Sequence, residues 1–272
     1  MAPINLPYYV PTSELPQPLP TNQEIHDSTE QLMGMGGRRL VRIGPYVVKY
    51  GTGVNCIEAE NMLFVKANSV TDTRVEMSSY IVMEYLEGHT LDFEWGLLSA
   101  QQKDGISDQL RGIERHGLLD CMFWTGDDAC APLSGPFNTE NGLNEAMCDK
   151  ATYNNLSPEK VEFYRRAFPV VLRDHAPVFT HGDFQRKNII IKRISPSTIR
   201  EVQSSDPEDD TFELAVIDWE NAGWYPNYWE FAIALFACGS WKDDWHKWVG
   251  RSLDLFLNEF VWMQMLRSEL WS

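Results

Sequence analysis

Two side chains five residues apart, Asp183 and Asn188, could take part in a metal-dependent reaction. They lie in VFTHGDFQRKNIII (178–191), where an apolar run leads into His181 and Gly182 and three isoleucines follow. A carboxylate can accept a proton from an attacking hydroxyl, and an amide oxygen can coordinate a metal ion. This pairing is typical of phosphoryl transfer, although a polar turn between two strands explains the same residues equally well.

A second acidic residue makes the simple turn a poorer explanation. Asp218 follows the apolar run LAVI in the segment LAVIDWENAGWYP (214–226). An acid at the end of a buried strand needs a turn to cap or a ligand to bind. Together, the two segments indicate a site more specifically than either does alone.

The chain resembles the aminoglycoside phosphotransferase and choline kinase-like family in HGDFQRKNIII and VIDWENAGWYPNYWEFA. The resemblance extends from about Leu40 to about Phe236 and is closest to the short fungal members. It implies an α+β, two-lobed protein-kinase-like fold, with a small β-rich N-lobe and a larger, mainly helical C-lobe. It also implies ATP- and Mg²⁺-dependent phosphorylation of a hydroxyl group on a small molecule.

The resemblance implies roles for four residues of the two segments. The catalytic residues would be Asp183, which orients and deprotonates the acceptor hydroxyl, and His181, which braces the loop by hydrogen bonding. Asn188 and Asp218 would each bind a Mg²⁺ ion. Gly182 stands where protein kinases have an arginine, so a phosphorylation-gated activation loop is not expected. The residues Gln-Arg-Lys at 185–187 replace the His-Pro-Gly often found in this family.

An N-terminal hairpin and the helix after it would position the nucleotide phosphates. Lys49 lies on YVVKY, the second strand of the hairpin, and either faces solvent or points into the kinase cleft. A helix is predicted over 54–67, with Glu58 inside its apolar stripe and Glu60 outside it. A buried acid needs a partner, so we predict an ion pair between Lys49 and Glu58.

A buried strand is predicted over SYIVMEYLEG (79–88). In the resembling kinases this strand leads into the hinge between the lobes, with Met83 as gatekeeper. The backbone carbonyl of Glu84 and the backbone amide of Leu86 would then hold adenine. Without the family, the segment indicates only a core strand.

The proposed organisation has three parts. Residues 1–22 are a Pro-rich tail, 23–87 the N-lobe, and 88–272 the C-lobe with the catalytic loop 181–188 and the metal-binding Asp218. Other expectations are a short helix at 23–33, helices at 91–117 and 157–175, a long irregular stretch at 118–150, a polar insertion at 195–211 and a helical tail from 229 to 271. The tryptophans at 241, 245 and 248 are spaced for one helix face, either as core packing or as an aromatic cage for a quaternary ammonium group.

The composition excludes some partners. The net charge of −16 argues against nucleic acid and anionic membranes and is compatible with a cationic substrate. No apolar run reaches membrane-spanning length, and the five cysteines include no C-x-x-C pair, so we expect a cytoplasmic protein with free thiols. The oligomeric state is not predicted.

Two other functions fit parts of the sequence. A metal-dependent hydrolase could use His181, Asp183 and Asp218, but the six histidines form no H-x-H or H-x-x-x-H pair. A catalytically inactive nucleotide-binding or scaffold protein would keep the fold, and the missing G-x-G-x-x-G-x-V motif allows it. Six acids of the 118–150 stretch would attract a cation and favour an amine-bearing alcohol as acceptor, whereas acids that face solvent beside an apolar pocket would suit a neutral natural-product alcohol. These acids are Asp120, Asp127, Asp128, Glu140, Glu145 and Asp149.

Overall fold

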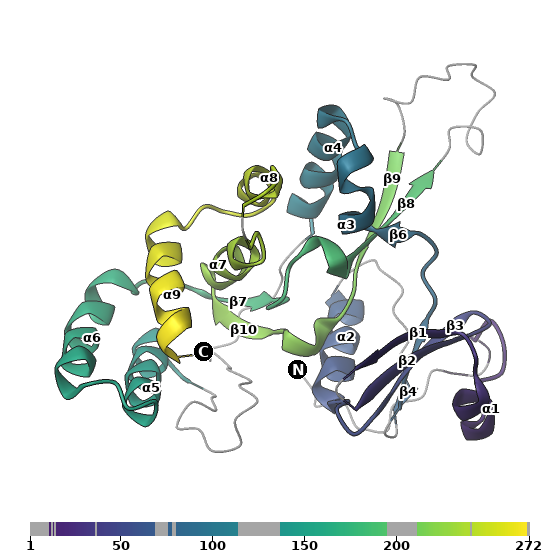
Figure 1. The fold of residues 1–272 in the computed structure, drawn as a ribbon, viewed down its shortest axis with the longest axis horizontal. Helices are drawn as coiled ribbons and strands as arrows, with labels where there is room; N and C mark the ends of the chain where they lie inside the picture. Colours follow the sequence, from purple (N-terminus) through teal and green to yellow (C-terminus); the bar gives the residue numbers. More distant parts are fainter. Residues whose placement is uncertain are drawn as a thin grey trace. The chain divides into compact units, whose positions relative to one another are not determined.

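The computed structural model describes residues 11, 13, 15–35, 37–68, 76–77, 80–113, 137–194, 211–239 and 241–270 (Figure 1). The chain divides into two compact units, Met1–Gly88 with Ile217–Glu220, and His89–Val216 with Asn221–Ser272. Asp218 therefore groups with the first unit rather than with the larger one. The predicted polar insertion lies outside the described residues except for Thr211.

Among its described residues, the first unit consists of an antiparallel sheet and two α-helices. The sheet has the strand order β1-β2-β3-β5-β4. Its elements are α1 (Asn22–Asp27), β1 (Gln31–Met35), β2 (Arg38–Ile43), β3 (Tyr46–Gly51), α2 (Cys56–Asn68), β4 (Glu76–Met77) and β5 (Tyr80–Glu84). The predicted hairpin is confirmed as β2 and β3.

Two predicted elements of the first unit, a helix and a strand, end earlier than expected. The helix expected at 23–33 ends at Asp27, because the next residue, Ser28, is extended and the chain turns into strand β1. β1 pairs with β2, so the backbone of 31–35 is satisfied by sheet hydrogen bonds instead of a helix. The strand expected to reach Gly88 ends at Glu84.

The strand alternation of β3 explains why Lys49 is buried. Val48 packs with Ile25 of α1 in one apolar cluster. The cluster of Ile81 on β5 instead contains Ala59 and Met62 of α2. Successive side chains of a strand point to opposite faces, so Lys49, next to Val48, points to the face covered by α2.

The described part of the second unit is mainly helical and contains two small sheets. The sheets have the strand orders β10-β7 and β6-β8-β9. The elements are β6 (His89–Thr90), α3 (Leu91–Glu94), η2 (Trp95–Leu97), α4 (Ala100–Arg111), α5 (Glu140–Tyr153), α6 (Pro158–Val171), β7 (Pro177–Thr180), η3 (Arg186–Asn188), β8 (Ile189–Ile194), β9 (Thr211–Val216), β10 (Gly223–Pro226), α7 (Trp229–Phe236), α8 (Trp245–Ser252) and α9 (Leu257–Leu270). The short helix η6 (Trp219–Asn221) begins in the first unit and ends in this one.

The stretch predicted to be irregular up to residue 150 ends in a helix. Thr139 caps the first turn of α5, and Leu143 and Met147 are buried one turn apart. They pack with Phe168 of α6 in the larger core of this unit. Tertiary packing therefore overrides the loop-like composition of the segment. The N-cap Ser157 and the proline after it start α6 as predicted.

The acids proposed to attract a cationic substrate are partly accounted for by α5. Glu140 binds His175, with 2.6 Å between its Oε1 and Nδ1 of the imidazole. Glu145 and Asp149 both pair with Arg165, at 3.4 and 3.3 Å. The remaining three lie outside the described residues: Asp120, Asp127 and Asp128. The acids of α5 therefore already have partners within the protein, Glu140 in an enclosed pair and Glu145 and Asp149 at the surface.

His175 lies between two carboxylates in the core of the second unit. Its Nε2 is 3.4 Å from Glu259, and its ring stacks edge-on against Tyr228, with 4.6 Å between ring centroids. Burial by itself lowers the pKa of His175, but the hydrogen bond and charge of Glu140 and the charge of Glu259 outweigh it, so the pKa is raised. Folding therefore favours the protonated imidazole.

Raising the pH is expected to remove the stabilisation that protonated His175 supplies. The contribution is fully present below the ordinary histidine pKa of about 6.5 and is lost as the pH rises through the higher folded-state pKa. The free energy of unfolding of wild type, compared with His175→Gln, should show a larger gap at about pH 6 than at about pH 9. A gap that stays constant or widens with pH would contradict this assignment.

Two further sequence expectations are addressed by the structure. Within the described parts of the chain, no helix has the length and apolar character needed to cross a membrane. Cys148 and Cys238 are free thiols, and burial raises the pKa of each to about 11. Both are therefore poor nucleophiles near neutral pH.

Candidate active site

Lys49 is the centre of a charged cluster in the first unit. Its Nζ lies 2.7 Å from Oε2 of Glu58, 3.0 Å from Oδ1 of Asp218 and 3.1 Å from Oε2 of Glu220. Lys49 and Glu58 are only 7% and 2% exposed. The ion pair predicted from the apolar stripe of α2 is therefore present, and Glu60 is half-buried outside it.

The charges of this cluster depend on one another. Burial lowers the pKa of Lys49, but Glu58 and Asp218 outweigh it, and the net effect is to raise the pKa. Burial also raises the pKa of Glu58, and Lys49 opposes that shift. Lys49 therefore stays protonated and can present a positive charge to an anionic ligand.

Asp218 is held in an unusual backbone conformation. Its φ of 65° lies in the left-handed region, which non-glycine residues seldom adopt. The next residue, Trp219, packs beside Ile81, and its carbonyl accepts a hydrogen bond from Asn61 of α2 at 3.0 Å. A strained acidic residue fixed by its neighbours is typical of functional sites.

Glu220 was not singled out as a site residue in the sequence, but it belongs to the same cluster. It pairs with Lys49 and with Arg38 at the start of β2. Carboxylate oxygens of Glu58, Asp218 and Glu220 all lie within 4.8 Å of one another. This group contains oxygen ligands and no histidine, so its donors suit Mg²⁺ better than zinc.

The catalytic-loop candidates of the second unit form a compact hydrogen-bonded turn. Nδ2 of Asn188 donates to the backbone carbonyl of Asp183 at 2.9 Å and to its Oδ2 at 2.8 Å. The backbone N–H of Asp183 donates to Nδ1 of His181 at 3.2 Å. Nζ of Lys187 lies 3.3 Å from Oδ2 of Asp183. Gln185 donates to the other carboxylate oxygen. The turn therefore fixes both predicted side chains in one short segment.

Gly182 is required by the close packing of this turn. Its φ is +77°, and a Cβ at this position would lie 2.2 Å from the backbone oxygen of Asn221. No other residue fits there without moving the backbone.

Glu230, which the sequence gave no reason to single out, anchors the start of the turn. It is 3% exposed and lies in the first turn of α7. Its carboxylate accepts the backbone N–H of His181 at 2.6 Å and that of Gly182 at 3.2 Å. A buried carboxylate that accepts two backbone hydrogen bonds orients the segment it holds.

Replacing Glu230 by alanine is expected to lower the free energy of unfolding by roughly 2–4 kcal/mol, since it removes the acceptor of two backbone donors. Glu230→Gln retains a carbonyl acceptor and should cost less. Urea unfolding of the two variants and wild type measures the difference. If Glu230→Ala unfolds at the wild-type midpoint, the anchoring role is wrong.

The backbone near the end of β5 leaves one edge open. The N–H of Tyr85 donates to the carbonyl of Pro45 at 2.7 Å, so this pair faces the hairpin. Because hydrogen-bonded and open pairs alternate in an antiparallel ladder, the backbone groups of Glu84 point to the opposite edge. β4 pairs with that edge at Ile81 and Val82.

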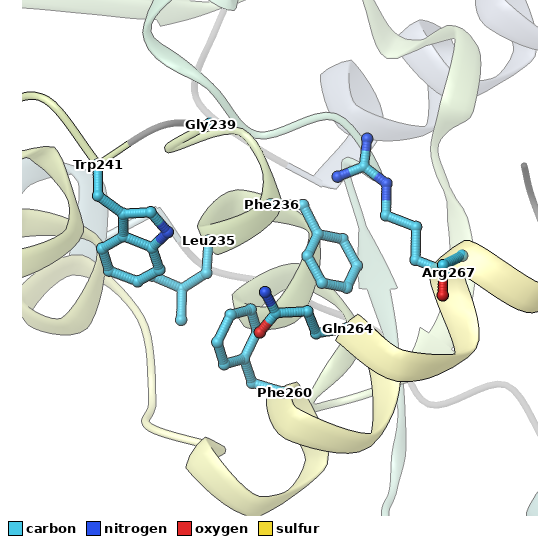
Figure 2. A pocket seen from close by; sticks show the side chains of 8 residues that line it. Leu235, Phe236, Gly239, Trp241, Phe260, Gln264 and Arg267 are labelled. Carbon is cyan, nitrogen blue, oxygen red and sulfur yellow. The ribbon is translucent and has the colours of Figure 1, made fainter.

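A cavity of about 390 Å³ lies between α7 and α9 (Figure 2). Its lining contains none of the predicted site residues: Leu235, Phe236, Gly239, Trp241, Phe260, Gln264, Arg267 and Ser268. Trp241 is 47% exposed and precedes α8, which begins at Trp245. The prediction that the three tryptophans share one helix face is therefore wrong for Trp241, because α8 begins one turn later, at Trp245.

Comparisons with known proteins address the fold. No protein-family model and no curated protein matches the chain. The ADP-bound aminoglycoside phosphotransferase APH(2'')-Ib matches with a TM-score of 0.54 and 15% identity, over 88% of this chain and 79% of that one. The aminoglycoside phosphotransferase APH(3'')-Id from Streptomyces rimosus gives 0.54 and 17%, over 91% and 95%. A choline/ethanolamine kinase family protein from Mesorhizobium loti gives 0.53 and 15%, over 89% and 76%.

These likenesses confirm the predicted fold. The chain has the two-lobed α+β, kinase-like fold of the aminoglycoside phosphotransferases and choline kinases. The sequence identities are low, and a shared fold does not by itself establish the activity or the acceptor substrate. Those depend on the residues of the site.

Proposed function

We propose that the chain transfers the γ-phosphoryl group of ATP to a hydroxyl group of a small molecule. The observation that carries the proposal is the buried ion pair of Lys49 with Glu58, together with the contact of Lys49 to Asp218. A buried lysine held by one carboxylate and adjacent to a second is the arrangement that binds nucleotide phosphates beside a metal ligand in kinase-type transfer.

Each charged group has a task in this transfer. The acceptor oxygen forms a bond to the γ-phosphorus, the bond from that phosphorus to the ADP oxygen breaks, and Asp183 takes the hydroxyl proton. Asp218 would bind one Mg²⁺ ion and Asn188 a second, and the two ions would neutralise phosphate charge. Because Nδ2 of Asn188 donates to Asp183, its Oδ1 is the atom suited to a metal ion. His181 would keep the turn in place through Nδ1.

We assign the adenine contacts to the open edge of β5. The carbonyl of Glu84 would be the acceptor, and the N–H of Leu86, two residues further on, would be the matching donor. A purine offers a matching donor and acceptor on one edge of its ring. Met83 packs partly buried against the apolar cluster of α2 and would border the same pocket.

We propose an amine-bearing alcohol as acceptor. The net charge of −16 attracts cations over long range, although the acids of α5 no longer contribute a specific argument. The structural neighbours include aminoglycoside phosphotransferases and a choline/ethanolamine kinase family protein, whose names refer to amine-bearing alcohols. ATP consumption measured across cationic, neutral and anionic alcohols at low and moderate salt tests this. A preference for neutral or anionic alcohols, or insensitivity to salt, would remove the charge argument.

Thermal stabilisation by Mg·ATP, followed by a turnover assay, tests the function itself. We expect Mg·ATP to raise the unfolding temperature, ATP without Mg²⁺ to raise it less, and phosphate transfer to follow. Stabilisation without any turnover would favour an inactive nucleotide-binding protein. Stoichiometric zinc in the purified protein, with hydrolysis that needs no ATP, would favour the hydrolase.

A further inference from the structure

Arg186 has a side chain that is unusually enclosed for a loop arginine. It lies in η3, between Asp183 and Asn188, and its side chain is 16% exposed. Its Nη2 lies 2.7 Å from Oδ2 of Asp243 and 3.1 Å from Oδ1 of Asp92. The two carboxylates come from the segment before α8 and from α3, far apart in the sequence. Arg186 therefore joins three segments of the second unit.

Two tryptophan rings flank the guanidinium group. Its central carbon is 5.3 Å from the ring centroid of Trp95 and 5.6 Å from that of Trp245. The two rings meet edge-on, with centroids 5.0 Å apart and an interplanar angle of 87°. Both distances are within the range of a cation–π interaction, which strengthens when the cation is shielded from water. Two rings and two carboxylates thus enclose one cation.

Trp95, one of the two flanking rings, is itself held in place, and so is the neighbouring Trp248. Asp244 accepts hydrogen bonds from Nε1 of Trp95 at 2.9 Å and from Nε1 of Trp248 at 3.0 Å. Lys103 of α4 pairs with the same carboxylate at 3.1 Å and lies 4.5 Å above the Trp95 ring. The rings of Trp95 and Trp245 therefore already contact cations of the protein itself, Arg186 at both rings and Lys103 at Trp95. This argues against the cluster as a cage for a quaternary ammonium group.

We propose that Arg186 is a positioning residue that clamps the catalytic loop to α3 and to the segment before α8, holding Asp183 and Asn188 in the geometry for transfer. The inference rests on the proposed function. Asp183 and Asn188 flank Arg186 closely in sequence, so fixing the middle of the loop restricts both. A reacting group that is held before the reaction loses less entropy in the transition state. A lysine ammonium is a compact charge without the planar face of the guanidinium, so it would not keep the contacts to both rings together with those of Nη2 to both carboxylates.

The test compares Arg186→Ala and Arg186→Lys with the matched control Arg165→Ala. Arg165 also pairs with two carboxylates of the second unit, but it lies on α6, away from the loop. We expect Arg186→Ala to lower kcat by about 100-fold with less than about a threefold change in KM for Mg·ATP, because a misplaced catalytic group costs mainly kcat. Arg186→Lys should recover little of this loss, and Arg165→Ala should stay within about twofold of wild type.

Two further readouts separate positioning from general stability. Amide hydrogen exchange over residues 181–188 should be at least about tenfold faster in Arg186→Ala and unchanged in Arg165→Ala. Dilute guanidinium chloride should partly restore kcat and slow exchange in Arg186→Ala by filling the enclosed site, whereas equimolar urea should not. If Arg186→Ala does not fold, Asp243→Asn, which removes one of the two carboxylates, should give the same changes in smaller measure.

The outcomes distinguish this proposal from the function on which it rests. Wild-type exchange and kcat in Arg186→Ala, or equal rescue by urea, would overturn the clamp. Faster exchange in Arg186→Ala alongside a wild-type protein that transfers no phosphate would keep the structural clamp and overturn the proposed activity. Equal loss of kcat in Arg165→Ala would show a general effect of lost ion pairs and would also overturn the clamp.

Discussion

Replacing Asp183 by asparagine is expected to abolish phosphoryl transfer while leaving Mg·ATP binding almost unchanged. Asparagine has the same shape but cannot take a proton, and removing a general base typically lowers the rate by about 10²–10⁴-fold. The carboxylate of Asp183 is fixed by Asn188 at 2.8 Å and by Lys187 at 3.3 Å. The loss should therefore come from chemistry and not from a disordered side chain.

Single-turnover transfer and calorimetric binding of Mg·ATP measure the two parts of this prediction separately. Asp254→Asn is a suitable control, since Asp254 is exposed and pairs only at the surface with Arg111. It should match wild type in both assays. A rate loss below about tenfold in Asp183→Asn, or a loss of nucleotide affinity as large as the loss of rate, would contradict the assignment.

Replacing Asp218 by asparagine is expected to remove both Mg·ATP binding and turnover. The carboxylate is the negatively charged oxygen donor that Mg²⁺ needs, and we expect affinity for Mg·ATP to fall by at least about 10–100-fold. Folding should survive, because Lys49 keeps its contacts to Glu58 and Glu220. Asparagine also tolerates the left-handed backbone at this position.

The contrast between the Asp183 and Asp218 variants is the decisive part of this experiment. Calorimetry should find near-wild-type affinity in Asp183→Asn and greatly reduced affinity in Asp218→Asn, with similar unfolding temperatures for both. Without Mg²⁺, wild type should resemble Asp218→Asn. If all three proteins bind Mg·ATP equally well, Asp218 does not hold the metal ion and the assignment is wrong.

Local patterns in the sequence predicted much of the site. The ion pair of Lys49 and Glu58 followed from the apolar stripe of the helix, because Glu58 lies inside it and a buried acid needs a partner. Lys49 was the partner because the family resemblance points it into the cleft, whereas its place on the strand alone left it facing either way. The hairpin, the start of α6 and the two-lobed fold were predicted from similarly local or motif-based signals.

Contacts between distant residues could not be predicted in this way. Arg186 meets Asp92 and Asp243, and Glu230 meets the start of the catalytic loop, through pairings of 48 residues or more that leave no mark on spacing. The loop-like composition before residue 150 hid α5, whose helix is stabilised by packing against α6. Regular spacing also misled, because Trp241 stands outside the helix that contains Trp245.

The fate of the γ-phosphoryl group tests the central claim most directly. Wild-type protein would be incubated with γ-labelled ATP, Mg²⁺ and a mixed panel of alcohols, and the label followed by phosphorus NMR and mass spectrometry. We predict that the label appears on the oxygen of an alcohol, that chelating Mg²⁺ abolishes it, and that Asp183→Asn produces none. Label that appears only as inorganic phosphate, or transfer to the alcohol that Asp183→Asn performs at the wild-type rate, would contradict the account.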